Sequence, residues 1–300
     1  MDYQQLLLAL LPDLLVVVAL FAAMGVDYSR LRGSRLAKRY EVACQISAAG
    51  LIAGLAVLVL QIAGTIPVME STADGQLVLN TGTLTLKALL YAMGLGVLPL
   101  AKRDQITPQV SEYFALLLLA TLGMGFVVTS RNLLGAFVAL ELVSLSLYAM
   151  TVLNQARRAS AEAALKYLTF GAVSSGFLLF GLSYLYGATE QLDLTQMTGL
   201  QHSPMLVLAY LLIFVGLGFK LALAPFHLWA PDVYQNAPTP VAGWIGSGSK
   251  IAAAALLIAL LQPVSDAPKL KEALIPALAA LAVLSMVVGN LGALRQTNLK

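Results

Sequence analysis

Charged residues are scarce in this sequence. They make up only 11% of its 300 residues, whereas 59% are hydrophobic and the mean hydropathy is +0.83. A typical soluble domain is about 25% charged, so this chain has too few polar residues to cover a folded surface in water. The composition therefore excludes an ordinary soluble domain.

Cysteine and histidine are almost absent as well. The single cysteine, Cys44, excludes an internal disulfide framework and a cysteine-rich metal or iron–sulfur site, and two histidines cannot build a haem or multi-histidine centre. The net charge of +3 is scattered without a basic block, which argues against nucleic acid as a partner. The segment GWIGSGSK at 243–250 resembles a phosphate-binding loop only superficially, because Ser249 interrupts the required spacing between glycine and lysine.

Long apolar runs dominate instead. Runs of about 20 residues match a helix that crosses a bilayer and exceed the roughly 10-residue strands of a membrane barrel. The first run lacks the basic start and the cleavage site of a signal peptide, so we expect it to be retained. Hydropathy predicts nine spans, at about 6–25, 42–64, 84–101, 112–128, 133–152, 161–187, 204–224, 240–262 and 273–293. We therefore expect an all-α integral membrane protein with about nine transmembrane helices, in a single domain over residues 1–300.

Loop charges predict how the chain sits in the membrane. Eleven basic residues fall on one side of the predicted spans and three, Arg131, Lys269 and Lys271, on the other. The eleven are Arg30, Arg32, Arg35, Lys38, Arg39, Lys102, Arg103, Arg157, Arg158, Arg295 and Lys300. Because basic loops stay on the cytoplasmic side, we expect the N-terminus to face away from the cytoplasm.

Four further lysines lie within the predicted spans. Lys87 is near the start of the third span, where we expect its amine to reach the membrane surface. Lys166, Lys220 and Lys250 lie inside three consecutive spans, where an unpaired charge costs at least about 2.5–3.5 kcal/mol. These three must therefore face a protein interior that supplies partners or water.

Acidic residues offer partners for these amines. Glu141, in GAFVALELVSLSLYAM, is the only acid at mid-depth in spans two to nine, so we expect it to pair with Lys220. Glu162 lies four residues before Lys166 on the same helical face, so a purely structural ion pair remains an open explanation there. Asp13 follows a proline and is interpreted as a helix start at the membrane surface.

The segment after Lys220 breaks the helical pattern. Its four prolines are Pro225, Pro231, Pro238 and Pro240. They alternate with large apolar residues, so the segment is too apolar for solvent and too proline-rich for a continuous helix. Breaks at membrane depth line cavities or lie buried in protein, and their freed carbonyl groups can hold an ion or a protonated amine. His227 follows the break and is either a proton relay or an ordinary packing residue.

These residues suggest a mechanism. An amine in apolar surroundings loses affinity for its proton, and a nearby carboxylate restores that affinity. Breaking a Glu141–Lys220 pair would therefore release a proton from Lys220, and Lys250 on the next helix can accept it through water. The pattern points to proton transport without a bound cofactor.

Four motifs carry a resemblance to a known family. PFHLWAPDVYQNAPTPV, FVALELVSLSLYAM, EAALKYL and GSGSK closely resemble the antiporter-like subunits of respiratory complex I, and their wording favours the subunit N branch. The resemblance implies three leading helices over 1–111, a five-helix unit over 112–262 with a broken seventh helix, and the start of a second unit over 263–300. It also implies that the relay residues are Glu141, Lys166, Lys220 and Lys250, with His227 as a possible addition.

The same resemblance implies a function and partners. It implies a proton-translocating membrane-arm subunit of a bacterial NADH–quinone oxidoreductase in the plasma membrane, beside subunit M, small subunits and lipid. The chain itself would bind no cofactor, since NADH, FMN, iron–sulfur clusters and quinone belong to other subunits. Family members carry a second inverted five-helix unit, which this sequence lacks, so we expect either a fragment or a chain truncated at its C-terminal end. The alternatives are a subunit of a cation/proton antiporter or of a membrane-bound hydrogenase, and a purely structural membrane spacer.

Overall fold

The computed structural model describes residues 3–69, 71–72, 76–153 and 158–297, and most of these residues are helical. Within these ranges, nine segments are long and apolar enough to cross a membrane, which confirms the predicted number of spans. The acidic residues Glu70 and Asp74 of the predicted loop 65–83 lie outside the described residues.

The helices follow the predicted spans closely. The eighth span is divided: α9 and α10 meet at Ser247, whose backbone bends away from the helical path (φ −118°, ψ −75°). The helices are α1 Tyr3–Val26, extended by a π-helical turn Asp27–Leu31, α2 Leu36–Ile62, α3 Thr81–Asp104, α4 Val110–Thr129, α5 Leu133–Val152, α6 Arg158–Thr189, α7 Pro204–Leu221, α8 Ala230–Asn236, α9 Thr239–Gly246, α10 Gly248–Ser265 and α11 Pro268–Leu294. Two short strands, β1 Ser71–Thr72 and β2 Leu77–Val78, form an antiparallel pair between α2 and α3.

Several helices begin at side-chain caps, which explains why their starts are sharp. Asn80 accepts a hydrogen bond from the backbone N–H of Thr83, and Asn132 accepts from two N–H groups at the start of α5. Ser203 caps α7, whose first residue is Pro204. Each cap satisfies donors that the first helical turn leaves unpaired, and proline fits that turn because it lacks an N–H group.

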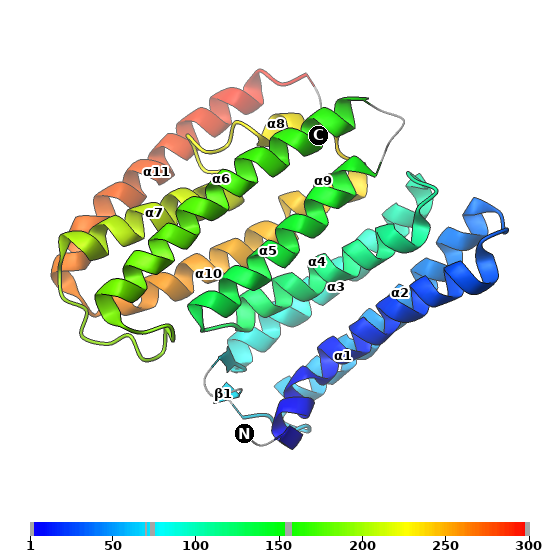
Figure 1. Ribbon diagram of the computed structural model, residues 1–300, viewed down its shortest axis with the longest axis horizontal. Helices are drawn as coiled ribbons and strands as arrows, with labels where there is room; N and C mark the ends of the chain where they lie inside the picture. Colours follow the sequence, from blue (N-terminus) through cyan, green and yellow to red (C-terminus); the bar gives the residue numbers. More distant parts are fainter. Residues whose placement is uncertain (1–2, 70, 73–75, 154–157, 298–300) are drawn as a thin grey trace.

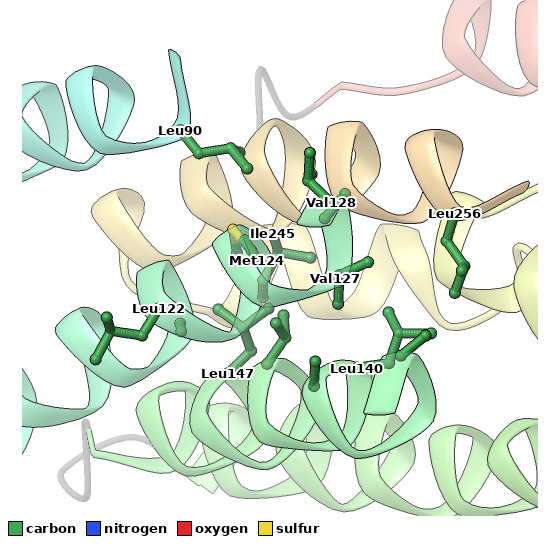
Figure 2. Close-up of a cluster of buried hydrophobic side chains, with 14 of the residues drawn as sticks. Leu90, Leu122, Met124, Val127, Val128, Leu140, Leu147, Ile245 and Leu256 are labelled. Carbon is green, nitrogen blue, oxygen red and sulfur yellow. The ribbon is translucent and has the colours of Figure 1, made fainter. Parts of the chain in front are cut away.

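The long helices lie side by side, with α1–α3 on one side and α6, α7 and α11 on the other (Figure 1). Helix α4 is at the centre: 78% of the residues in its apolar 18-residue stretch are buried, whereas only 6% are buried in the corresponding stretch of α11. Figure 2 shows Met124 and Val127 of α4 packed near Leu140 and Leu147 of α5 and Ile245 of α9. Because α5 packs directly on this core, the residues that α5 carries toward α7 are held in fixed positions.

A fully buried ion pair joins α1 to α3, where the sequence indicated two surface groups. The amine of Lys87 lies 2.6 Å from a carboxylate oxygen of Asp13, and the hydroxyl of Tyr91 donates to the other oxygen at 2.7 Å. Lys87 is 1% exposed and Asp13 3% exposed. The interpretation of both residues as interfacial is therefore wrong. Asp13 lies inside α1, and each charge is satisfied by the other.

Replacing Asp13 with asparagine should destabilise the protein by about 3–5 kcal/mol, because Lys87 would be left as an unpaired buried charge. Replacing both residues at once, Asp13→Leu with Lys87→Met, should recover most of that loss, since no charge then remains. Thermal unfolding in detergent measures both changes. A double variant as unstable as the single one would contradict this account of the pair.

Candidate functional site

The break after α7 is built by a left-handed residue. Helix α7 ends at Leu221, and Ala222 adopts φ +56°. The N–H of Ala222 then bonds to the carbonyl of Phe219 at 3.0 Å, and the N–H of Leu223 to that of Gly218 at 2.8 Å. These two hydrogen bonds, from the residues after the helix to carbonyl groups of its last turn, form the Schellman motif. The motif leaves the carbonyl groups of Lys220 and Leu221 without partners inside the helix.

Lys250 binds one of these freed carbonyl groups. Its amine donates a hydrogen bond to the backbone oxygen of Lys220 at 2.8 Å and lies 5.0 Å from the ring centre of Trp229. The expectation that a freed carbonyl holds an amine is confirmed. The two lysines are therefore linked through the main chain at the end of the broken helix.

Glu141 and Lys220 form the predicted pair. The amine of Lys220 lies 3.7 Å from a carboxylate oxygen of Glu141 and donates a hydrogen bond to the hydroxyl of Ser144, one turn further along α5. The hydroxyl of Ser175 on α6 donates to the same carboxylate oxygen at 2.5 Å. The Lys220 side chain is 9% exposed and that of Glu141 27%. Three helices, α5, α6 and α7, therefore meet at one partly buried charge pair.

Aromatic rings enclose the two amines. The amine of Lys220 lies within 6 Å of the ring centres of Tyr148 and Phe219, at 5.9 and 5.8 Å. Trp229 stacks on Tyr167, with ring centres 4.5 Å apart and planes 10° apart, and also contacts Phe219. An aromatic face attracts a cation while adding no hydrogen-bond partner. The rings therefore favour charged amines and limit access of water.

Some polar atoms near the break have no hydrogen-bond partner among the described residues. They are the Tyr148 hydroxyl, the Trp229 indole nitrogen and Nδ1 of His227. Buried polar groups of this kind are normally satisfied by ordered water. His227 lies after the break, as its place in the sequence requires, and its Nδ1 is buried. This position is compatible both with a proton relay and with an ordinary packing residue.

Lys166 lies apart from the Glu141 pair. Its amine is 2.8 Å from Glu162 on its own helix and 2.8 Å from Asp232 on α8, and its side chain is 41% exposed. Lys166 has acidic partners as expected, and the ion pair with Glu162 is confirmed, but the group lies at the surface of the described residues and not in their interior. Asp232 escaped the sequence analysis because it lies among the prolines. The signal available was an acid just after a membrane-depth break.

Ala222 should be replaceable by glycine with a gain in stability. A left-handed conformation costs a residue with a Cβ about 1–2 kcal/mol, which glycine does not pay, while its greater freedom in the unfolded chain offsets part of this. We expect Ala222→Gly to raise the unfolding free energy by about 0.5–1 kcal/mol. The control is Ala209→Gly in the middle of α7, which should lower it by about 1 kcal/mol or more. Thermal unfolding of both variants decides, and a destabilised Ala222→Gly variant would contradict the strain assigned here.

The fold and the site define a class: an all-helical, multi-pass membrane protein with a partly buried carboxylate–lysine pair beside a broken helix. The chain belongs to the NADH:quinone oxidoreductase/Mrp antiporter transmembrane family, whose model matches residues 130–300. The matched region contains Glu141, Lys166, Lys220, Lys250 and the break.

Individual relatives agree with this assignment. NADH-quinone oxidoreductase subunit N 2 of Acidobacterium capsulatum is 44% identical over 100% of this chain and 63% of its own length. A chain in the structure of respiratory complex I from Thermus thermophilus with bound aureothin superimposes with a TM-score of 0.75 at 34% identity, over 95% of this chain and 58% of its own. An archaeal membrane-bound sulfane sulfur reductase gives a TM-score of 0.69 at 25% identity, over 97% and 60% of the two chains. This chain thus spans about three-fifths of the length of these relatives.

Proposed function

We propose that this chain carries protons within the membrane arm of an NADH–quinone oxidoreductase, by moving them between Glu141, Lys220 and Lys250. The observation that carries the proposal is the Glu141–Lys220 pair, held at 3.7 Å beside a broken helix whose end carbonyl is bound by Lys250. Charges at this depth are costly and occur mainly where ions or protons move.

The relay has two states in this proposal. While the pair is closed, the carboxylate of Glu141 favours the charged form of Lys220, which keeps its proton. When the pair opens, Lys220 loses the nearby negative charge, and its burial away from water then outweighs the weak attraction of the rings and favours the neutral amine, so Lys220 releases the proton. A neutral Lys250 accepts it through water near the Lys220 carbonyl. The broken end of α7 permits Lys220 to move away from Glu141, because residues 222–229 lie outside any helix.

His227 and Lys166 take secondary places in the proposal. His227 has a buried Nδ1 without a partner among the described residues, and it is the candidate for the next proton acceptor along the chain. Lys166 lies at the exposed edge of the unit, where its bond to Asp232 ties α6 to the segment after the break. We place it at the outer end of the relay.

The partners and cofactors follow from the relatives. As the Acidobacterium relative is named subunit N 2 of NADH-quinone oxidoreductase, we propose that this chain lies beside other membrane-arm subunits, including subunit M, in a bacterial plasma membrane. NADH, FMN, iron–sulfur clusters and quinone would be bound by those other subunits, and this chain would perform no redox chemistry.

Orientation and internal division are part of the proposal. The count of basic residues supports an N-terminus on the non-cytoplasmic side, although Arg157 and Lys300 of that count lie outside the described residues. The division into 1–111, 112–262 and 263–300 stays a prediction.

A second candidate is a subunit of a cation/proton antiporter or of another respiratory membrane complex. The family description includes the Mrp antiporter, and the sulfane sulfur reductase shares the fold. Proton flux should be measured in proteoliposomes that contain the complete native complex. Our proposal predicts flux that requires NADH and quinone, whereas flux driven by a sodium gradient without NADH would favour the antiporter.

A further inference from the structure

An apolar groove lies on the far side of the aromatic wall that encloses the lysines. Its volume is about 330 Å³, and it is lined by α6, α7 and the segment after the break. The residues that matter most are Phe170, Val173 and Phe177 on α6, Phe219 on α7, and Phe226 and Trp229 after the break. Phe170, Val173 and Phe177 are between 41% and 57% exposed, so the groove opens at the surface of the described residues, along a helix long and apolar enough to span a membrane.

The chemistry of the groove selects a hydrocarbon. Its only hydroxyl, on Ser174, already donates a hydrogen bond to the carbonyl of Gly216 at 2.8 Å. The remaining lining residues are aromatic, aliphatic or proline. The indole nitrogen of Trp229, which is unpaired among the described residues, is itself buried, so a ligand with polar groups would lose hydration there without reaching a partner. A saturated or lightly branched hydrocarbon chain has no polar group and therefore loses no hydrogen bond on entering the groove.

A charged stripe on α6 continues from the groove. Arg158, Glu162 and Lys166 precede Phe170 at steps of four residues, so each lies about one turn from the next, along a line that winds gradually around the helix. From Lys166 to Phe177 the helix rises about 16 Å. That distance is close to the thickness of one leaflet of the hydrocarbon core, about 15 Å. The stripe therefore provides a polar end and an apolar end at the separation found in a lipid.

The polar end matches a headgroup that carries both signs of charge. Glu162 and Asp232 are 68% and 48% exposed at the side chain, and each binds Lys166, so their other oxygens are available to a second cation. Arg158 is exposed one turn closer to the start of α6. The four charges sum to zero, and the carboxylates suit an ammonium group while Arg158 suits a phosphate.

We infer that this surface binds a phospholipid with a primary-amine headgroup, with one acyl chain in the groove and the headgroup over Arg158, Glu162 and Asp232. The bound chain lies against Phe219 and Trp229, whose rings also face the amines of Lys220 and Lys250. The lipid therefore completes the apolar wall of the lysine site and restrains the broken segment. This inference stands without the proposed proton relay, because it rests only on the groove and the charged stripe.

The test is photo-crosslinking of the intact native complex in lipid nanodiscs. The probe is a phosphatidylethanolamine with a diazirine at the middle of one acyl chain, and crosslinked peptides are located by mass spectrometry. We expect labelling of the α6 stretch 170–177. Val173→Trp, which fills the groove, should lower it at least about tenfold, the loss expected when two buried methylenes are displaced. Val138→Trp on the exposed face of α5 is the matched control and should leave it unchanged.

Further variants and probes in the same crosslinking experiment distinguish between the possible ligands of the groove. The double variant Glu162→Gln with Asp232→Asn should lower capture of the amine-headed probe about threefold. It should not lower capture of an anionic phosphatidylglycerol probe, because Lys166 loses its two neighbouring negative charges. Val173→Ala, which cannot overfill the site, should keep the labelling and guards against misfolding of the tryptophan variant. Even labelling of all exposed apolar surfaces, no effect of Val173→Trp, preferred capture of a quinone-tail probe, or crosslinks from a neighbouring subunit into the groove would each overturn the inference.

Discussion

Replacing Lys220 with alanine is expected to stop proton transfer through this unit while the complex still assembles. The variant removes the amine that Glu141 pairs with and leaves Lys250 with no neighbouring donor. A positioned acid or base typically contributes 10²–10⁴-fold, so the proton-transfer rate should fall by about that factor. The measurement is the proton-to-electron ratio during NADH oxidation in proteoliposomes, with assembly checked by native electrophoresis.

The matched control is Lys102→Ala, which also removes a lysine from an ion pair. Lys102 pairs with Glu41 at 3.0 Å, but both side chains are about half exposed, so its loss should change neither stability nor proton yield measurably. Lys220→Arg keeps the charge and should retain part of the activity. If Lys220→Ala pumps with an unchanged ratio, Lys220 is a packing residue and the chain acts as a structural spacer.

Glu141→Gln should impair pumping more than it impairs assembly. Glutamine keeps the shape of the side chain and can still accept the hydrogen bond from Ser175, so packing is preserved. It cannot supply the negative charge that favours the protonated form of Lys220, and the switch between the two states of the amine is lost. We expect the proton-to-electron ratio to drop nearly as far as in Lys220→Ala, with unfolding temperature little changed.

Glu112→Gln provides the comparison for this variant. Glu112 accepts a hydrogen bond from Tyr28 at an exposed position, so its neutralisation should leave the ratio as in the unmodified protein. An unaltered proton yield in Glu141→Gln would remove the carboxylate from the relay. The Glu141–Lys220 contact would then be explained by helix packing alone.

The membrane spans and the central pair could be predicted from the sequence for clear physical reasons. Apolar length alone defines a membrane helix, so nine spans follow without knowledge of their packing. A lysine inside a membrane requires a partner, and Glu141 was the single acid available at mid-depth in spans two to nine. The prolines after Lys220 likewise require a break, whatever the helix packs against.

The details that depend on contacts between distant helices could not be predicted. Asp13 and Lys87 each look like surface groups when taken singly, and their pairing depends on how α1 meets α3. Lys166 binds Asp232 only because α8 folds back against α6. The contact of Lys250 with the Lys220 carbonyl depends on the left-handed conformation of Ala222. Glycine is the usual sequence signal for that conformation, and this position has none.

The most direct test of the central claim is a double-mutant cycle on Glu141 and Lys220, read out as the proton-to-electron ratio of the reconstituted complex. Residues that act as one unit give strongly non-additive effects. We predict that Glu141→Gln with Lys220→Met loses no more proton transfer than Lys220→Met alone. Independent, additive losses would contradict the claim that the two residues hold and release one proton together.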